Sequence, residues 1–110
     1  MELLVCVINK PELLDDVLAG LLEAGVSGST VVESQGMGKI ISRDIPIFSG
    51  FKGLFTGARE SNFTIFSVVK EKEVLENAIR TIQQVYGSFN EPASGVLFTV
   101  PVSRVLGLRS

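Results

Sequence analysis

The sequence has no histidine and no tryptophan, and only one cysteine in 110 residues. Without histidine, one chain cannot assemble the usual zinc ligand sets or use histidine for acid–base catalysis. The single cysteine, Cys6, cannot form a disulfide within the chain. Cys6 lies in the middle of an apolar run without a basic neighbour, which is typical of a buried packing residue. We therefore expect no metal site, no resident cofactor and no enzymatic activity.

Long hydrophobic runs and an excess of positive charge are also missing. Apolar residues make up 45% of the chain, but charges interrupt them well before the ~20 residues that a membrane-spanning helix needs. The net charge is −2 and the basic residues are scattered, so no nucleic-acid partner and no direct membrane insertion are expected. Met1–Glu2 is not followed by a basic leader and a cleavage site, which favours a cytoplasmic protein.

The length predicts a single domain, residues 1–110. The run 3–8 is continuously apolar, as in a strand that is covered on both sides. From Pro11, leucine and valine recur at helical spacing up to Gly25, which is suited to cap a helix. Residues 30–35 predict a second strand.

The second half of the chain repeats this order. Residues 63–69 predict a third strand, and Glu71 opens a second amphipathic helix that ends at Tyr86–Gly87. A fourth strand follows at 96–100, with Pro101 at its end. The order βαβ, long loop, βαβ predicts an α+β fold: a ferredoxin-like βαββαβ sandwich with a four-stranded antiparallel sheet and two helices on one face. The strands are too apolar to leave the other face in water, so we expect copies of the chain to cover it.

The segment 36–62 between the second and third strands is longer than an ordinary connection in a compact domain. Its glycines permit rearrangement, while its phenylalanines indicate contact with another protein. The sequence therefore predicts a partner-docking loop that uses Phe48, Phe51, Lys52 and Phe55.

Several motifs in order carry a family resemblance. They are Lys10-Pro11, Leu14-Asp15-Asp16-Val17, the turn Gly25-Val26-Ser27-Gly28-Ser29-Thr30-Val31, Gly36-Met37-Gly38 and Val102-Ser103-Arg104-Val105. Together they resemble the P-II nitrogen-regulatory signalling proteins over nearly the whole chain. The resemblance implies a homotrimer that binds an adenine nucleotide as effector in clefts between subunits. It also implies a loop that docks on a target protein, namely a transporter, an enzyme or a regulator.

The same resemblance implies where the nucleotide would bind. Thr30 matches a hydroxyl that contacts adenine, and Val68 matches a backbone contact to the base. Lys39 and Arg109 match cations beside the phosphates, Arg109 reaching them from a neighbouring subunit. The backbone of the Gly-x-Gly motif lies along the nucleotide, which makes the implied set Thr30, Gly36, Met37, Gly38, Lys39, Val68 and Arg109. The alternatives are an ordinary strand residue at Thr30, a plain turn at the glycines and a solvated tail at Arg109.

Departures from the family pattern affect the choice of ligand. The segment 87–95 contains no lysine, Val96 stands where the family has a further lysine, and Gly107 replaces a second tail arginine. Each lost charge-assisted contact weakens phosphate binding by about 1.5–3 kcal/mol, which favours ADP or AMP over ATP. Ile40 replaces a glutamine that helps to bind Mg²⁺ and 2-oxoglutarate, so that ligand is not expected.

The sequence also leaves room for a scaffold, whereas it gives no support to an enzyme. A trimer that has lost its ligand could keep 36–62 as a docking element, giving a ligand-independent scaffold. An enzyme has no support, because no nucleophile has a neighbouring base and the pair Asp15–Asp16 suits a helix start. Other ferredoxin-like trimers, such as the divalent-cation-tolerance family, would share the fold without indicating a function.

Overall fold

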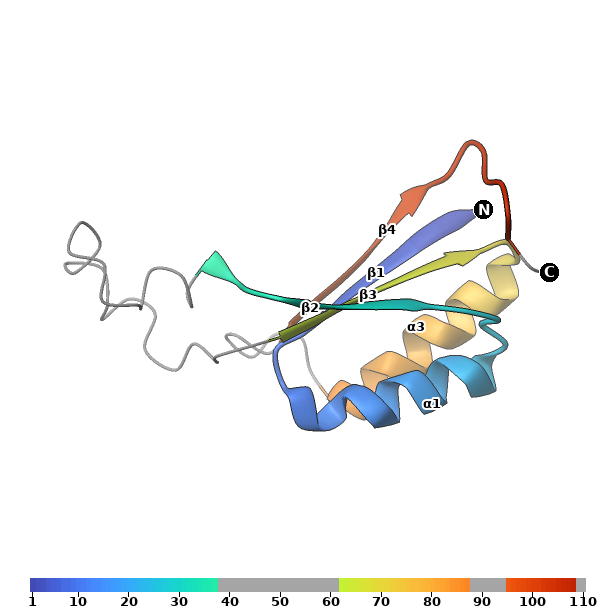
Figure 1. Ribbon diagram of the computed structural model, residues 1–110. Helices are drawn as coiled ribbons and strands as arrows, with labels where there is room; N and C mark the ends of the chain where they lie inside the picture. The colour runs from blue at the N-terminus through green and yellow to red at the C-terminus, as the bar shows by residue number, and fades with distance from the viewer. Residues whose placement is uncertain (38–61, 88–94, 109–110) are drawn as a thin grey trace.

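A computed structural model describes residues 1–37, 62–87 and 95–108, and Figure 1 shows the arrangement of its helices and strands. Four strands form one antiparallel sheet in the order β2-β3-β1-β4. Both helices lie side by side on the same face of the sheet (Figure 1). The fold is the predicted ferredoxin-like sandwich. Its elements are β1 (Glu2–Ile8), η1 (Pro11–Leu13), α1 (Leu14–Ala24), β2 (Thr30–Ser34), β3 (Asn62–Val69), α3 (Lys72–Tyr86) and β4 (Gly95–Pro101).

The first helix follows the predicted pattern with one local difference at its start. Pro11 opens a 3-10 turn, and the α-helix proper begins at Leu14 with two aspartates in its first turn. Negative charge there is favourable because it lies near the positive end of the helix dipole. Gly25 ends the helix with φ 101, a left-handed conformation in which its N–H reaches the carbonyl oxygens of Leu21 and Leu22.

The two helices approach each other closely through Gly20 of α1. A Cβ atom added at Gly20 would lie 2.4 Å from Cγ2 of Thr81 in α3, so this position has no room for a larger residue. The second helix is amphipathic and turns its buried side toward α1 and the sheet through Leu75, Ala78, Ile82 and Tyr86.

Alternate residues of the strands complete a core between the sheet and the helices, on what we call the covered face. The core side chains of β1 are Leu4, Cys6 and Ile8, at 1%, 0% and 0% exposure, and Ile65 of β3 is equally enclosed. Cys6 is thus the buried packing residue that the sequence predicts. Ser67 is a buried polar residue here, and its hydroxyl lies 2.5 Å from that of Ser29, which satisfies both groups.

On the opposite side of the sheet, which we call the open face, no helix formed by residues 1–37, 62–87 or 95–108 is present (Figure 1). Phe66, Val5 and Phe98 are direct neighbours across β3, β1 and β4, so their side chains share this face. Val5 is 5% exposed between the two phenylalanines, whereas Phe66 and Phe98 remain 38% and 46% exposed. Val96 and Val100 of β4 are similarly exposed. The open face therefore leaves an apolar surface on the protomer.

Candidate functional site

A small pocket lies where the turn after α1 meets the end of β3 and the start of α3. Its volume is about 120 Å³. Three stretches that are far apart in the sequence contribute to it, including the C-terminal tail at Leu108. The lining residues are Gly25, Val26, Ser27, Val68, Val69, Lys70, Glu71, Val74 and Leu108.

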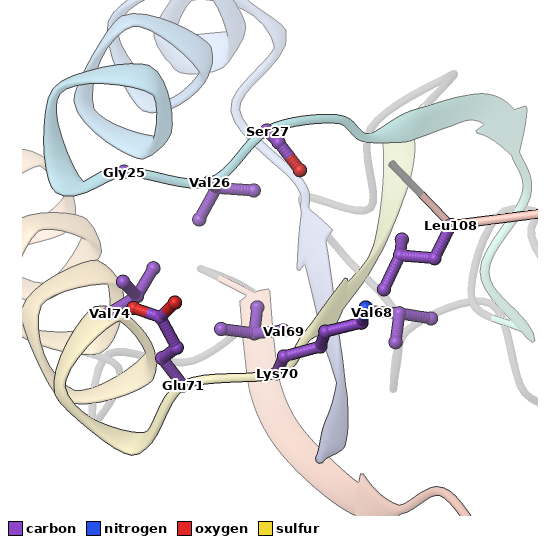
Figure 2. Close-up of a pocket in the computed structure, with 9 residues that line it drawn as sticks. All are labelled: Gly25, Val26, Ser27, Val68, Val69, Lys70, Glu71, Val74 and Leu108. Carbon is purple, nitrogen blue, oxygen red and sulfur yellow. The ribbon is translucent and has the colours of Figure 1, made fainter. Parts of the chain in front are cut away.

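Figure 2 shows how polar and apolar groups divide this pocket. Lys70 extends its amine toward Val68 and Leu108, while the Glu71 carboxylate lies beside Val74. The hydroxyl of Ser27 is directed into the space from the opposite side. The pocket has an apolar wall with charged and hydroxyl groups at its rim. Such a pocket suits a flat or apolar portion of a ligand that has hydrogen-bonding groups at its edges.

Two of the predicted nucleotide contacts, Thr30 and Val68, lie at this same end of the sheet. Val68 lines the pocket, and Thr30 starts β2 directly opposite Phe66. Thr30 and Val68 are therefore diagonal neighbours on the open face, at a typical separation of about 7–8 Å. The Ser29–Ser67 hydrogen bond fixes the chain immediately before Thr30.

Gly36 and Met37 lie beyond the other end of β2. Gly36 lies six positions after Thr30, which in an extended strand amounts to about 20 Å. Met37 is 67% exposed, and a Cβ added at Gly36 would lie 3.6 Å from Nδ2 of Asn62. Gly36 and Met37 do not lie at the pocket. A ligand that contacts the pocket and also Gly36 would have to extend along β2.

The remaining predicted contacts lie outside the described residues. They are Gly38, Lys39 and Arg109 of the nucleotide set and Phe48, Phe51, Lys52 and Phe55 of the docking loop.

Gly107, which stands where the resemblance places a second tail arginine, has φ +84. Residues with a side chain rarely adopt this left-handed conformation, whereas glycine does so without strain. The backbone of the tail is thus shaped for glycine, and an arginine at this position would be strained.

Burial affects the pKa values of two ionisable side chains, Cys6 and Tyr86. Burial raises the pKa of the Cys6 thiol from 9.0 to about 11, so the thiol is neutral and unreactive near neutral pH. Burial also raises the pKa of Tyr86, although hydrogen bonds from the backbone of Asn9 and Lys10 oppose that effect. Within residues 1–37, 62–87 and 95–108, no three metal-ligating side chains gather into a possible ion site.

Sequence reasoning did not identify Ser27, Lys70, Glu71 and Leu108 as lining residues. The signal for Lys70 and Glu71 was present, since two opposite charges follow an apolar strand directly and precede a helix. Ser27 was noted only as part of a turn motif. Leu108 could not be found from the sequence, because its place depends on the path of the tail.

The chain is a ferredoxin-like α+β protein with an open apolar sheet face and a pocket beside β3, and comparison with known proteins identifies its family. The model of the family described as "Nitrogen regulatory protein P-II" matches residues 1–110. A "Nitrogen regulatory protein P-II" from Azospirillum brasilense is 32% identical over 107 residues, covering 94% of this chain and 88% of the relative. The chain belongs to the P-II family and is a P-II-like regulatory protein of nitrogen signal transduction.

In the part of the chain that the structure describes, no helix has the length and apolarity to cross a membrane.

Proposed function

We propose that this protein is a homotrimeric, non-enzymatic regulator that binds an adenylyl nucleotide between subunits and controls a target protein through the segment 36–62. The proposal combines membership of the P-II family with two features of the protomer: the apolar open face and the pocket beside Thr30 and Val68.

The observation that carries the proposal is the exposure of large apolar side chains on the open face. Phe66, Phe98, Val96 and Val100 are each between 38% and 48% exposed; Phe66 lies on β3 and the other three lie on β4, with β1 between the two strands. An apolar surface of this kind is costly in water and favours contact with copies of the chain. A cleft between such copies also supplies the depth that a chain of 110 residues lacks.

Thr30 and Val68 mark where the base of the nucleotide would lie, next to the pocket. The Thr30 hydroxyl can exchange a hydrogen bond with a ring nitrogen or an exocyclic amine, and apolar walls favour burial of a flat base. The ribose and phosphates would then run along β2 toward Gly36 and Met37, where glycine permits close approach of the backbone to the ligand.

ADP or AMP fits this site better than ATP. Arginine at position 107 would be strained, since Gly107 has φ +84, so the tail does not offer the pair of arginines that the family resemblance implies. Each further phosphate adds negative charge without adding a protein cation. We expect affinity to fall from ADP to ATP.

Calorimetric titration with AMP, ADP, ATP and cyclic dinucleotides tests the ligand. Thr30→Val, which keeps the shape of the side chain and removes the hydroxyl, should weaken ADP binding about 3- to 10-fold. Thr99→Val on β4 is the matched control and should bind ADP as the unchanged protein does. If no nucleotide gives a binding signal at millimolar concentration, the protein is not a nucleotide-binding regulator. Light scattering measures the mass in solution and tests the trimer independently.

The second candidate is a trimeric scaffold that docks on its partner without a ligand. The glycine conformation at position 107 favours it, because a tail with one arginine fewer binds phosphate less tightly. For such a scaffold, binding to the target should depend on Phe48, Phe51 and Phe55 and should not change when nucleotide is added. Target binding that responds to ADP would exclude it.

A further inference from the structure

A row of side-chain hydrogen bonds crosses one end of the sheet. The Ser34 hydroxyl lies 2.8 Å from that of Thr64 and donates to Oδ1 of Asn62 at 2.5 Å. Nδ2 of Asn62 donates in turn to Oδ1 of Asn9 at 2.9 Å. The backbone N–H of Asn9 donates to the Tyr86 hydroxyl at 3.0 Å. We call these five residues the polar row.

The polar row joins four elements that are distant in the sequence. Ser34 ends β2, Asn62 and Thr64 belong to β3, Asn9 follows β1, and Tyr86 is the last residue of α3. The side chains of Ser34, Asn62 and Thr64 lie on the open face, since they alternate with the core residues of their strands. Tyr86 belongs to the core on the covered face, so the row passes around the end of β1 from one face to the other.

Each end of the row lies against a glycine that borders a connection between elements. At the β2 end, Nδ2 of Asn62 is 3.6 Å from the position of a Cβ added at Gly36. At the α3 end, the Tyr86 hydroxyl is 2.8 Å from a Cβ added at Gly95, the first residue of β4, where φ is +149. The Tyr86 hydroxyl therefore packs directly against the start of β4, where only glycine leaves room for it.

Tyr86 is itself held on several sides. Its side chain is 5% exposed, and the ammonium group of Lys10 lies 5.8 Å from the centre of its ring. Connected hydrogen bonds in partly buried surroundings depend on one another, because loss of one partner leaves the next group unsatisfied. The row can thus transmit a change at one end to the other.

We propose that the polar row couples the backbone at Gly36 to Tyr86 and Gly95, with Asn62 and Asn9 as its positioning residues. A nucleotide whose phosphates lie along Gly36 displaces or orders Asn62, and the row passes this change to the end of α3. The ligand part of this inference rests on the proposed function. The coupling itself is a property of the protomer and can be tested without a ligand.

The first experiment uses the protein without nucleotide. Tyr86 is the only tyrosine and the chain has no tryptophan, so the ring signals of isotope-labelled tyrosine in a nuclear magnetic resonance spectrum report this residue alone. Ser34→Ala, which does not touch Tyr86, should shift these ring signals and the Asn9 amide signal. Unchanged signals in folded Ser34→Ala and Asn62→Ala proteins would overturn the coupling.

Two further variants separate the row from general damage. Asn9→Asp keeps the oxygen that accepts from Asn62 and should leave the Tyr86 signals close to their original positions, whereas Asn9→Ala should shift them. Asn77→Ala removes a half-buried side chain of α3 whose Oδ1 accepts a hydrogen bond from Arg80 at 3.1 Å, outside the polar row, and it should have no effect. A shift of equal size in Asn77→Ala would mean that the Tyr86 signals do not report the row.

The second experiment adds ADP and follows calorimetry and the Tyr86 signals together. ADP should shift the Tyr86 signals, and Asn62→Ala should weaken binding about 10-fold and remove the shift, while Asn77→Ala changes neither. Binding of ADP without any shift would overturn the coupling and leave the proposed function standing. Absence of ADP binding would reject the proposed function, and the experiment without nucleotide then decides the coupling alone.

Discussion

The two faces of the sheet carry similar apolar residues but differ in how much of them is exposed to solvent. Ile65 and Phe66 are consecutive in β3, yet Ile65 is 1% exposed and Phe66 is 38% exposed. Helices α1 and α3 account for the difference, because they cover the first face and leave the second open (Figure 1). Apolar character alone thus does not indicate where the core of a protomer lies. The open face leaves large apolar side chains such as Phe66 and Phe98 exposed, which is the basis of the proposed contact between copies.

The most direct test of this difference between the two faces is to truncate a side chain on the covered face. Ile65→Ala should lower the free energy of unfolding by about 2–5 kcal/mol, since the cavity it leaves is enclosed on all sides. Val32→Ala is the control, at a β2 residue that is 45% exposed, and should change stability by no more than about 0.5 kcal/mol. Urea unfolding measures both. Equal losses would mean that the open face is as tightly packed within the protomer as the covered face.

A charge placed on the open face tests its proposed contact with other copies. Phe98→Asp should dissociate the proposed trimer, because each subunit would lose up to about 1.5–3 kcal/mol of apolar burial and would have to desolvate a carboxylate. Light scattering gives the mass, and circular dichroism checks that the protomer stays folded. Leu22→Asp is the matched control, since Leu22 of α1 is 73% exposed on the other layer. Dissociation by Leu22→Asp alone would place the interface on the helices instead.

The helix layer that closes the covered face depends on the contact between Gly20 and Thr81. Alanine is a better helix former than glycine by about 1 kcal/mol, but its Cβ would lie 2.4 Å from Cγ2 of Thr81. We expect Gly20→Ala to destabilise the protein by about 1 kcal/mol net, measured by urea unfolding.

Thr81→Ser provides the second half of this test. It removes Cγ2 and keeps the hydroxyl that donates to the carbonyl oxygen of Asn77 at 2.8 Å. In the double variant, alanine at position 20 should therefore regain the favourable helix propensity, and stability should rise above that of Gly20→Ala. A double variant no more stable than Gly20→Ala would show that this contact is not what limits the packing of the helices.

The smallest expected effect concerns pH and the covered face. The folded protein raises the pKa of Cys6 from 9.0 to about 11, so the neutral thiol is favoured by folding. The contribution of the neutral Cys6 thiol to the free energy of unfolding is fully present below pH 9.0 and is lost as the pH rises through about 11. At a pH of about 10 the loss should be on the order of 1 kcal/mol.

Cys6→Ala removes this contribution and provides the control. Its stability should fall less steeply between neutral and alkaline pH than that of the unchanged protein. Tyr86, whose pKa is also raised, contributes in the same direction above its usual pKa and remains in both proteins. Identical slopes for the two proteins would show that Cys6 is not desolvated as its burial indicates.

Local features of the fold were predictable because neighbouring residues decide them. Gly25 was recognised as a helix cap, and it ends α1 with φ 101. The end of the second helix at Tyr86–Gly87 is also confirmed. The 3-10 turn at Pro11–Leu13 was not foreseen, because proline suits the first turn of either kind of helix.

The candidate site was less predictable than the fold. Thr30 and Val68 were named from a resemblance, and their proximity follows from the pairing of Thr30 with Phe66, which no local pattern specifies. The polar row was missed altogether. Asn9 and Tyr86 are separated by 77 positions along the chain, and neither carries a signal that refers to the other.

The sequence by itself determined the α-helices and strands of the described residues and the family, because strand alternation, helix periodicity and ordered motifs depend on neighbouring residues. Only the tertiary structure decided which apolar strand residues are covered, which residues line the pocket and how Ser34 is linked to Tyr86. Those features depend on register and on the side of the sheet that the helices occupy. Both are set by the packing of the whole chain, in which residues far apart in the sequence are brought into contact together.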